Sequence, residues 1–183
     1  MELGGSLRLH RRILAETSGA ALVELAIALP LLVMLVVGMV SAGVAYNHQL
    51  ALSHAAREGG RFGATLPVSN YLSMNDWLDA VAVTAVSDAT GTLGAGVAGH
   101  FVCVAYVHPD GTLTSDSTRR RVDTGGSVVY SDSATCFLDS RPSSERRVQV
   151  AVARDAEFSV VFFSSTLTLD SDAVSRFEAA LGG

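Results

Sequence analysis

The sequence predicts an α+β protein: a long N-terminal transmembrane helix continues into a small exported domain of one helix packed on an antiparallel sheet. Three observations predict this class. An uncharged apolar stretch runs from Leu25 to Tyr46, and a helical apolar pattern follows at residues 74–89. Apolar and alternating segments between Phe101 and Leu169 then have the character of strands. The expected organisation is a leader at 1–19, the long helix at 20–64 and the exported domain at 65–183.

The apolar stretch from Leu25 to Tyr46 is long enough to cross a bilayer. At the rise of an α-helix it spans roughly 33 Å, against a hydrocarbon core of about 30 Å. Three arginines, at positions 8, 11 and 12, precede it in a short leader. This bias favours a cytoplasmic N-terminus, with everything after Tyr46 outside the cytoplasmic membrane.

A glycine and a carboxylate stand at the mouth of this stretch. Glu24 is costly in apolar surroundings, and such residues are usually functional. An ordinary secretory signal loses its apolar stretch to cleavage beyond it. Here the well-placed small residue is Gly19, so cleavage there keeps the apolar helix and makes Ala20 the new N-terminus, with Glu24 fifth. The pattern resembles a class III prepilin signal; the alternative is a plain signal anchor with an accidental Glu.

Two strings carry a more specific resemblance. Residues 19–32 read Gly-Ala-Ala-Leu-Val-Glu-Leu-Ala-Ile-Ala-Leu-Pro-Leu-Leu, and residues 55–64 read Ala-Ala-Arg-Glu-Gly-Gly-Arg-Phe-Gly-Ala. They resemble the TadE-like family, the minor pseudopilins of the tight-adherence (Tad/Flp) pilus machinery, and residues 167–178 are similar to that family's closing strand. Leu25 stands where major Flp pilins often carry an aromatic residue, and the chain is far longer than those pilins. Both departures favour a minor component over the shaft subunit.

The resemblance implies a structural protein, not an enzyme, that a prepilin peptidase cleaves between Gly19 and Ala20. It implies partners among other Tad pseudopilins or pilins and the Tad membrane platform proteins, at the cytoplasmic membrane or in a surface pilus. It also implies that the Glu24 carboxylate pairs with the new α-amino group of Ala20, in the same chain or in a neighbouring subunit. The alternative is a membrane-anchored adhesive or ligand-binding module with no part in pilus assembly.

Composition agrees with a membrane-anchored exported domain. Hydrophobic residues make up 49% of the chain and charged residues only 17%, which is apolar for a soluble protein. Loss of residues 1–19 removes three Arg and two Glu and leaves ten Arg against sixteen acids, a net charge near −6. We therefore expect no nucleic-acid partner.

Two helices are expected. The first runs from Ala20 to about Arg61, with a bend near Ala26–Pro30, because Pro30 removes one backbone hydrogen bond. Gly59, Gly60, Gly63 and Pro67 are expected to break it. The second helix is expected from Met74 to Ala89, capped by Ser73 with Asp76 three residues on, and with Met74, Trp77, Leu78, Val81 and Ala85 on its core face.

Three to five strands are expected after the second helix. Phe101–Val107 is nearly all apolar, as for a strand covered on both faces, and residues 109–111 form a turn before a short strand at 112–114. Residues 115–147 are expected to be a long exposed excursion around one short strand at 127–130. The remaining strand signals are the alternation at Val148, Val150 and Val152, the apolar run Phe158–Phe163, and an alternating strand that begins at Leu167 and Leu169.

No arrangement of residues predicts catalysis, a cofactor or a small-molecule substrate. There is no G-x-S-x-G, H-E-x-x-H or phosphate-binding motif. His100, Cys103, His108 and Cys136 are imaginable metal ligands, but His100 and Cys103 fall on opposite faces of one strand, so we expect no metal. Two sets of charged residues are expected to be solvated: Asp170 and Asp172 on one strand face, and Arg119–Arg121 in a loop, with a partner contact as the alternative for the arginines.

Cys103 and Cys136 are expected on the oxidising side of the membrane, where disulfides persist. The simplest reading is one disulfide that ties the 115–147 excursion to the sheet. Closing a loop of about 33 residues stabilises a fold by roughly 3–4 kcal/mol on the chain-entropy model. Two free thiols and a bridge to a partner pseudopilin are the competing readings.

Overall fold

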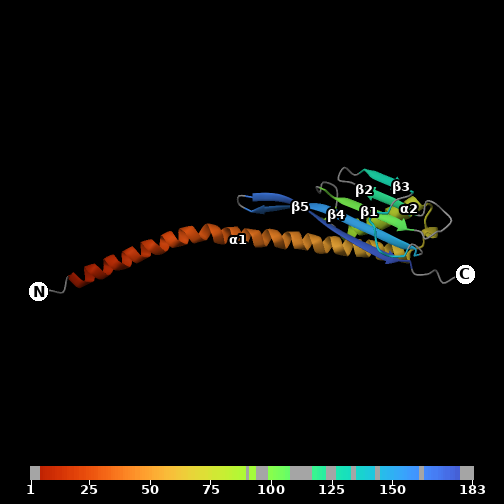
Figure 1. Ribbon diagram of the computed structural model, residues 1–183. Coiled ribbons are helices and arrows are strands. Elements are labelled where there is room, and N and C mark those ends of the chain that lie inside the picture. Colours follow the sequence, from red (N-terminus) through yellow and green to blue (C-terminus); the bar gives the residue numbers. More distant parts are fainter. Residues whose placement is uncertain are drawn as a thin grey trace. The chain divides into compact units, whose positions relative to one another are not determined.

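A computed structural model gives the fold of the chain (Figure 1). It describes residues 5–89, 91–93, 99–107, 117–122, 127–132, 135–142, 145–160 and 163–177; the side chains of residues 5–18, 117–121 and 160 are outside this description. In chain order the elements are α1 (Gly5–Thr65), the short 3-10 helix η1 (Val68–Asn70), α2 (Met74–Asp88), β1 (Phe101–Val107), β2 (Ser117–Val122), β3 (Val128–Ser131), β4 (Arg147–Val160) and β5 (Phe163–Arg176). The chain packs as two units, residues 1–43 with 159–164 and residues 44–158 with 165–183.

Helix α1 is longer than expected at both ends. It contains 61 residues, begins within the segment expected to be a leader and runs through Pro30. The expected break at Gly59, Gly60 and Gly63 is wrong, because the helix continues through all three to Thr65. The physical reason is packing: these glycines are buried against the rest of the domain, and that contact outweighs their low helix propensity.

Helix α2 confirms the expected start and ends one residue earlier than expected. The Ser73 side chain caps it by accepting a hydrogen bond from the Asp76 backbone N–H at 3.2 Å. Trp77 is fully buried, as expected for a core residue, and its Nε1–H donates to the Leu66 carbonyl oxygen at 3.0 Å. This hydrogen bond ties α2 to the segment that follows α1.

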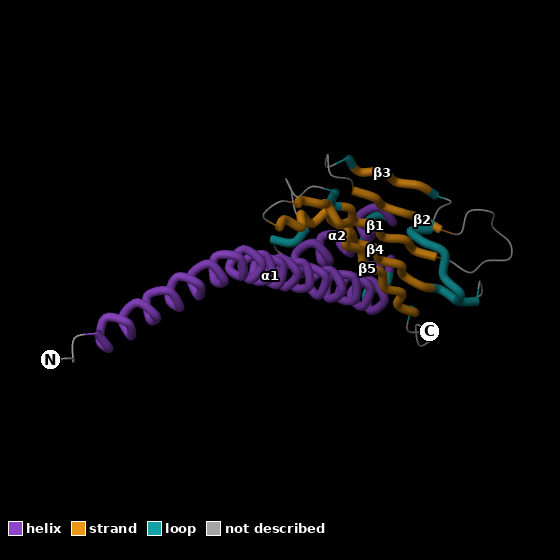
Figure 2. Tube along the Cα trace, turned by 60° about the vertical axis from the view of Figure 1, so that its left-hand side comes forward, coloured by secondary structure: helices purple, strands orange, loops and turns teal. Residues whose placement is uncertain are grey.

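The five strands form one sheet in the order β3-β2-β1-β4-β5 (Figure 2). β1 lies in the centre and pairs antiparallel with both β2 and β4, with Val102 opposite Val152 and Val104 opposite Val150 in the β1–β4 register. The expected strand at 101–107 is confirmed with its bounds, and six of its seven residues are buried. The sheet is therefore covered on both faces at its centre.

The interpretation of residues 115–147 as an excursion around one strand is partly wrong. The strand expected at 127–130 exists as β3, but Arg119–Arg121, expected in a loop, lies in strand β2. β2 pairs with β1 on one side and β3 on the other, so backbone hydrogen bonds stabilise it despite its polar composition. The turn expected at 109–111 and the strand expected at 112–114 lie outside the described residues.

The C-terminal strands are longer than their apolar patterns indicated. The alternation at Val148–Val152 and the start of the Phe158–Phe163 run belong to one 14-residue strand, β4, and β5 begins at Phe163 instead of Leu167. The pairing of β4 with β1 ends at Ala153, so residues 154–160 extend past β1. We call β4 from Arg154 onward, together with Phe163–Leu169 of β5, the ribbon.

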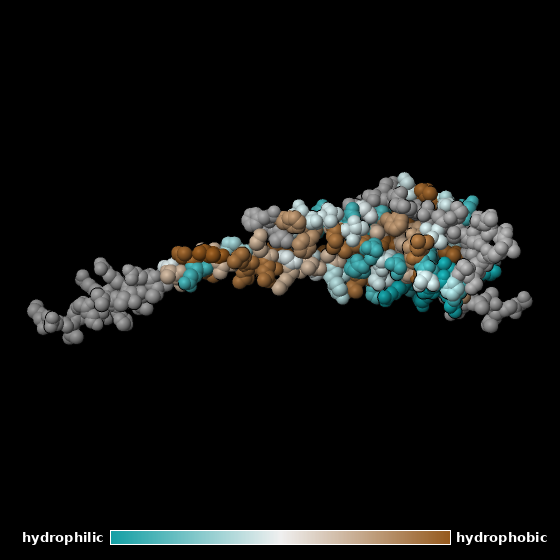
Figure 3. All heavy atoms as spheres, in the orientation of Figure 1, coloured by the Kyte–Doolittle hydropathy of each residue, from teal (hydrophilic) through white to brown (hydrophobic). Residues whose placement is uncertain are grey.

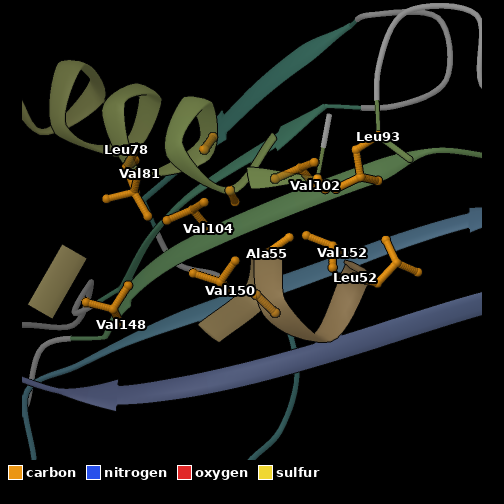
Figure 4. Packing of buried hydrophobic residues seen from close by; sticks show 14 of the residues in the cluster. Leu52, Ala55, Leu78, Val81, Leu93, Val102, Val104, Val148, Val150 and Val152 are labelled. Carbon is orange, nitrogen blue, oxygen red and sulfur yellow. The ribbon is translucent and has the colours of Figure 1, made fainter. Parts of the chain in front are cut away.

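The hydrophobic core lies between the sheet and the two helices. Val102 and Val104 of β1 meet Val148, Val150 and Val152 of β4 (Figure 4). Leu52 and Ala55 of α1 and Leu78 and Val81 of α2 complete the cluster, and Leu52, Leu78 and Val81 are fully buried. The C-terminal part of α1 is thus part of the core of the unit formed by residues 44–158 and 165–183.

Candidate assembly site on helix α1

The N-terminal part of α1 presents large apolar side chains that the chain itself leaves uncovered (Figure 3). The most exposed of them are Leu22, Val23, Ile27, Leu31, Leu32, Met39 and Val40. Within the described residues, α1 is the one helix long and apolar enough to cross a membrane. An exposed apolar surface of this length requires an apolar environment, which a bilayer provides.

The residues predicted for cleavage and assembly lie together at the start of this surface. Gly19, Ala20 and Glu24 are all on α1 and all exposed. Among the described side chains, none forms a hydrogen bond or an ion pair with the Glu24 carboxylate. Glu24 is therefore available to a group from outside the described part of the chain.

The glycines of α1 fall into two classes, according to what a Cβ atom would meet. At Gly19, Gly38 and Gly43 a Cβ atom would have no heavy atom within 4 Å beyond its own helix. Nothing within the described structure requires glycine at these positions, although glycine costs a helix about 1 kcal/mol relative to alanine. No contact within the described structure therefore accounts for the glycine at position 19.

The second class of glycines brings α1 close to its neighbours. A Cβ at Gly59 would lie 2.9 Å from the Ala85 Cβ, and one at Gly60 would lie 2.8 Å from the Ser175 Oγ. A Cβ at Gly63 would crowd three core side chains at 3.1–3.3 Å. Sequence reasoning assigned these residues to a helix break. The sequence does contain a signal for their packing role, because Ala55, Gly59 and Gly63 recur every four residues, as do Ala56 and Gly60. This spacing places small residues on one face of a helix.

The opposite face of the sheet holds the expected disulfide, together with a buried polar cluster that the sequence did not predict. Cys103 of β1 and Cys136 form a disulfide with an S–S distance of 2.08 Å. Beside it the fully buried Gln149 accepts a hydrogen bond from the Cys136 backbone N–H at 3.1 Å. The Gln149 Nε2 donates to the Asp139 carboxylate at 2.6 Å. The segment after Cys136 is thus fixed to the sheet.

An ion pair completes this cluster. The Arg147 Nε lies 2.9 Å from the Asp139 Oδ2, and each side chain is only 9% exposed. Burial alone would raise the pKa of the Asp139 carboxyl. Hydrogen bonds from the Gln149 side chain and the Arg141 backbone N–H, with the ion pair to Arg147, outweigh burial and hold that pKa below its usual value. Asp139 is therefore ionised in the folded domain at neutral pH.

The other residues considered for chemistry do not come together. Cys103 and Cys136 are used in the disulfide, His100 is buried, and His108 lies outside the described residues. In the described part of the chain, no group of three or more His, Cys, Asp or Glu side chains is placed to hold a metal ion. Asp170 and Asp172 are exposed on β5, as solvated side chains are.

Comparison with known proteins finds a match, and it lies on helix α1, which carries Gly19, Ala20 and Glu24. Residues 19–61 match the family model described as TadE-like protein. This segment is TadE-like. No curated protein and no solved structure matches the chain.

The TadE-like match begins at Gly19 and includes Glu24, the apolar stretch and Gly59 and Gly60. The family is a structural pilus component, so the match supports a role associated with a Tad pilus, at a membrane. It covers glycines of both classes: Gly19, Gly38 and Gly43, where a Cβ atom would meet nothing, and Gly59 and Gly60, which lie against other elements.

Proposed function

We propose that this protein is a TadE-like minor pseudopilin, a structural subunit for assembly of a Tad/Flp-type pilus. In this proposal residues 1–19 are a leader that a prepilin peptidase removes, α1 anchors the protein in the cytoplasmic membrane, and residues 65–183 lie outside. The observation that carries the proposal is the TadE-like segment, which begins at the proposed cleavage site. The three arginines of the leader support the orientation.

Cleavage between Gly19 and Ala20 is supported by the open space around Gly19. The fold leaves room for any side chain there, so a requirement for glycine must come from a peptidase that accommodates the residue before the scissile bond without a side chain. Cleavage would place a positive α-amino group four residues before Glu24. Both groups would then lie at the start of the apolar surface.

The Glu24 carboxylate is proposed to pair with that α-amino group, on the same chain or on a neighbouring subunit. In an apolar, low-dielectric environment such a pair is strong, and the lone carboxylate is costly. No described side chain offers the carboxylate a partner. The α-amino group would supply one, and pairing between subunits would direct assembly with other Tad pseudopilins and the platform proteins.

The variant Glu24→Gln tests this role. It keeps size and helix propensity but removes the charge, so we expect normal cleavage and membrane insertion with loss of co-purifying pilus components and of piliation. The matched control is Glu58→Gln on the same helix, where Glu58 forms an exposed ion pair with Arg61 that contributes little. If both variants assemble as the natural protein does, Glu24 has no assembly role, and the membrane-anchored binding module becomes the better interpretation.

A further inference from the structure

The ribbon carries a long uncharged sequence in an otherwise charged domain. No charged residue occurs from Phe158 to Leu169, and hydroxyl side chains at 159, 164–166 and 168 are interspersed among the apolar ones. Phe163 is 64% exposed and Leu167 is 55% exposed. The exposed apolar ring of Phe163 stands beside the hydroxyls of Ser164 and Ser165, so the start of β5 combines apolar and polar groups as interfacial segments do.

One hydrogen bond places the end of the ribbon beside the apolar part of α1. The Ser41 Oγ donates to the Ser159 carbonyl oxygen at 3.0 Å, and both residues belong to the same compact unit. Ser41 lies five residues before Tyr46, the last residue of the uncharged stretch, which corresponds to about 8 Å along a helix. The end of the ribbon is therefore level with α1 residues that the proposed anchor places at the outer boundary of the bilayer.

We propose that the end of the β4–β5 ribbon lies in the outer interfacial layer of the membrane, with Phe163 at the boundary of headgroups and acyl chains. This inference rests on the proposed membrane anchoring of α1. We infer that lipid covers this part of the ribbon for two reasons. Ser159 of the ribbon is hydrogen-bonded to Ser41 of α1, within the uncharged stretch of that helix. Residues 158–169 also carry no charge that would oppose insertion. The ribbon is the protein's second membrane contact.

The depth of this contact is limited by the backbone. A two-stranded ribbon leaves N–H and C=O groups unpaired on its outer edges, and such groups are not tolerated in hydrocarbon. The interfacial layer still supplies water and headgroup oxygens to these groups and to the ribbon hydroxyls. Phe163 alone needs to reach the acyl chains.

Site-directed labelling of the full chain tests the proposal. The native cysteines form a disulfide, so Phe163→Cys introduces the one thiol that an environment-sensitive fluorophore will label. The labelled protein is reconstituted into vesicles of phosphatidylcholine and phosphatidylglycerol. We expect emission shifted to shorter wavelength, loss of most of the fluorescence with lipids that carry a nitroxide near the headgroup, and less loss with aqueous iodide.

Two control positions separate this inference from the anchoring proposal. Val36→Cys lies near the middle of the apolar stretch and should be quenched most by nitroxides deep in the acyl chains. Leu138→Cys lies outside the ribbon at a 97% exposed position and should be quenched by iodide alone. A deep Val36 label with a Phe163 label that only iodide quenches overturns the ribbon contact. An aqueous Val36 label overturns the anchor itself.

The remaining outcome concerns a protein partner. A Phe163 label that both lipid nitroxides and iodide fail to quench, and that becomes accessible on dilution with excess lipid, shows that a second copy covers it and contradicts the lipid contact. If the fluorescence emission of Trp77, the single tryptophan, shows that Phe163→Cys does not fold, Ser164→Cys carries the label instead. Ser164 is the next residue of β5 and is exposed.

Discussion

The part of α1 from Gly19 to Gly43 and the domain from residue 44 onward use the same residue types for opposite purposes. In the core of the domain, glycine, apolar side chains and polar groups meet partners within the chain: Gly59 lies against Ala85, and Gln149 is fully buried and hydrogen-bonded. From Gly19 to Gly43, glycines have empty space around them and leucines are exposed. Contacts within the chain account for the core of the domain, whereas no contact within the described residues accounts for the glycines and exposed leucines of the N-terminal part.

This difference predicts that changes in the domain alter stability and leave processing intact, while changes near Gly19 do the reverse. The largest stability effect is expected from the disulfide. Replacing both Cys103 and Cys136 by alanine should lower the free energy of unfolding by about 3–4 kcal/mol, because the unfolded chain regains the entropy of a 33-residue loop. The emission of Trp77, the single tryptophan, measures unfolding in urea.

Treatment of the natural protein with a reductant is the control for that variant, because it opens the loop without removing side-chain atoms. Two reactive thiols in the natural protein under oxidising conditions would contradict the intramolecular disulfide. A dimer that dissociates on reduction would instead point to a bridge between chains.

The next largest effect is expected from Asp139→Asn, about 3 kcal/mol at neutral pH, because Arg147 would stay buried without its ion pair. The pKa of Asp139 is lowered by folding, so its contribution to stability is present above the unfolded-state pKa, about 4, and is lost as pH falls through the folded pKa. Urea unfolding from pH 7 to pH 3 should show the two proteins converging at the acidic end. A constant difference across that range would contradict the assignment.

A smaller effect is expected from adding one methyl group to the domain half of α1. Gly59→Ala places a Cβ 2.9 Å from Ala85, so α2 must shift. Overpacking costs about 1–3 kcal/mol and improved helix propensity returns up to about 1, which leaves a net loss of about 1–2 kcal/mol. The matched control Gly38→Ala meets no atom and should leave domain unfolding unchanged. Equal effects at the two glycines would remove the distinction between the two parts of the helix.

The sequence predicted the elements whose local signals agree with their packing. The bounds of α2 were predicted closely from the Ser73 cap and the apolar face of the helix. Those of β1 were predicted from its apolar run. Prediction from the sequence failed where tertiary contact opposes local preference. Arg119–Arg121 forms a strand because it pairs with β1 on one side and β3 on the other. Gly59 and Gly63 lie in a helix because their position packs closely against other elements.

The candidate site divides in the same way. Gly19, Ala20, Glu24 and the apolar stretch follow from order along the chain, so the sequence alone predicts them. The cluster of Asp139, Arg147 and Gln149 joins a loop to a strand, and no periodic pattern marks that meeting. Such contacts become visible only once the sheet register is known.

The central claim is that the leader is removed and the apolar helix is kept. The most direct measurement is the mass and N-terminal sequence of the protein isolated from membranes of cells with a prepilin peptidase. We predict that the mature chain begins at Ala20, that Gly19→Val accumulates the full-length form, and that Gly38→Val, equally free of contacts, is processed normally. A mature chain that begins beyond Tyr46, or natural protein that retains Met1 in the presence of the peptidase, would contradict the account.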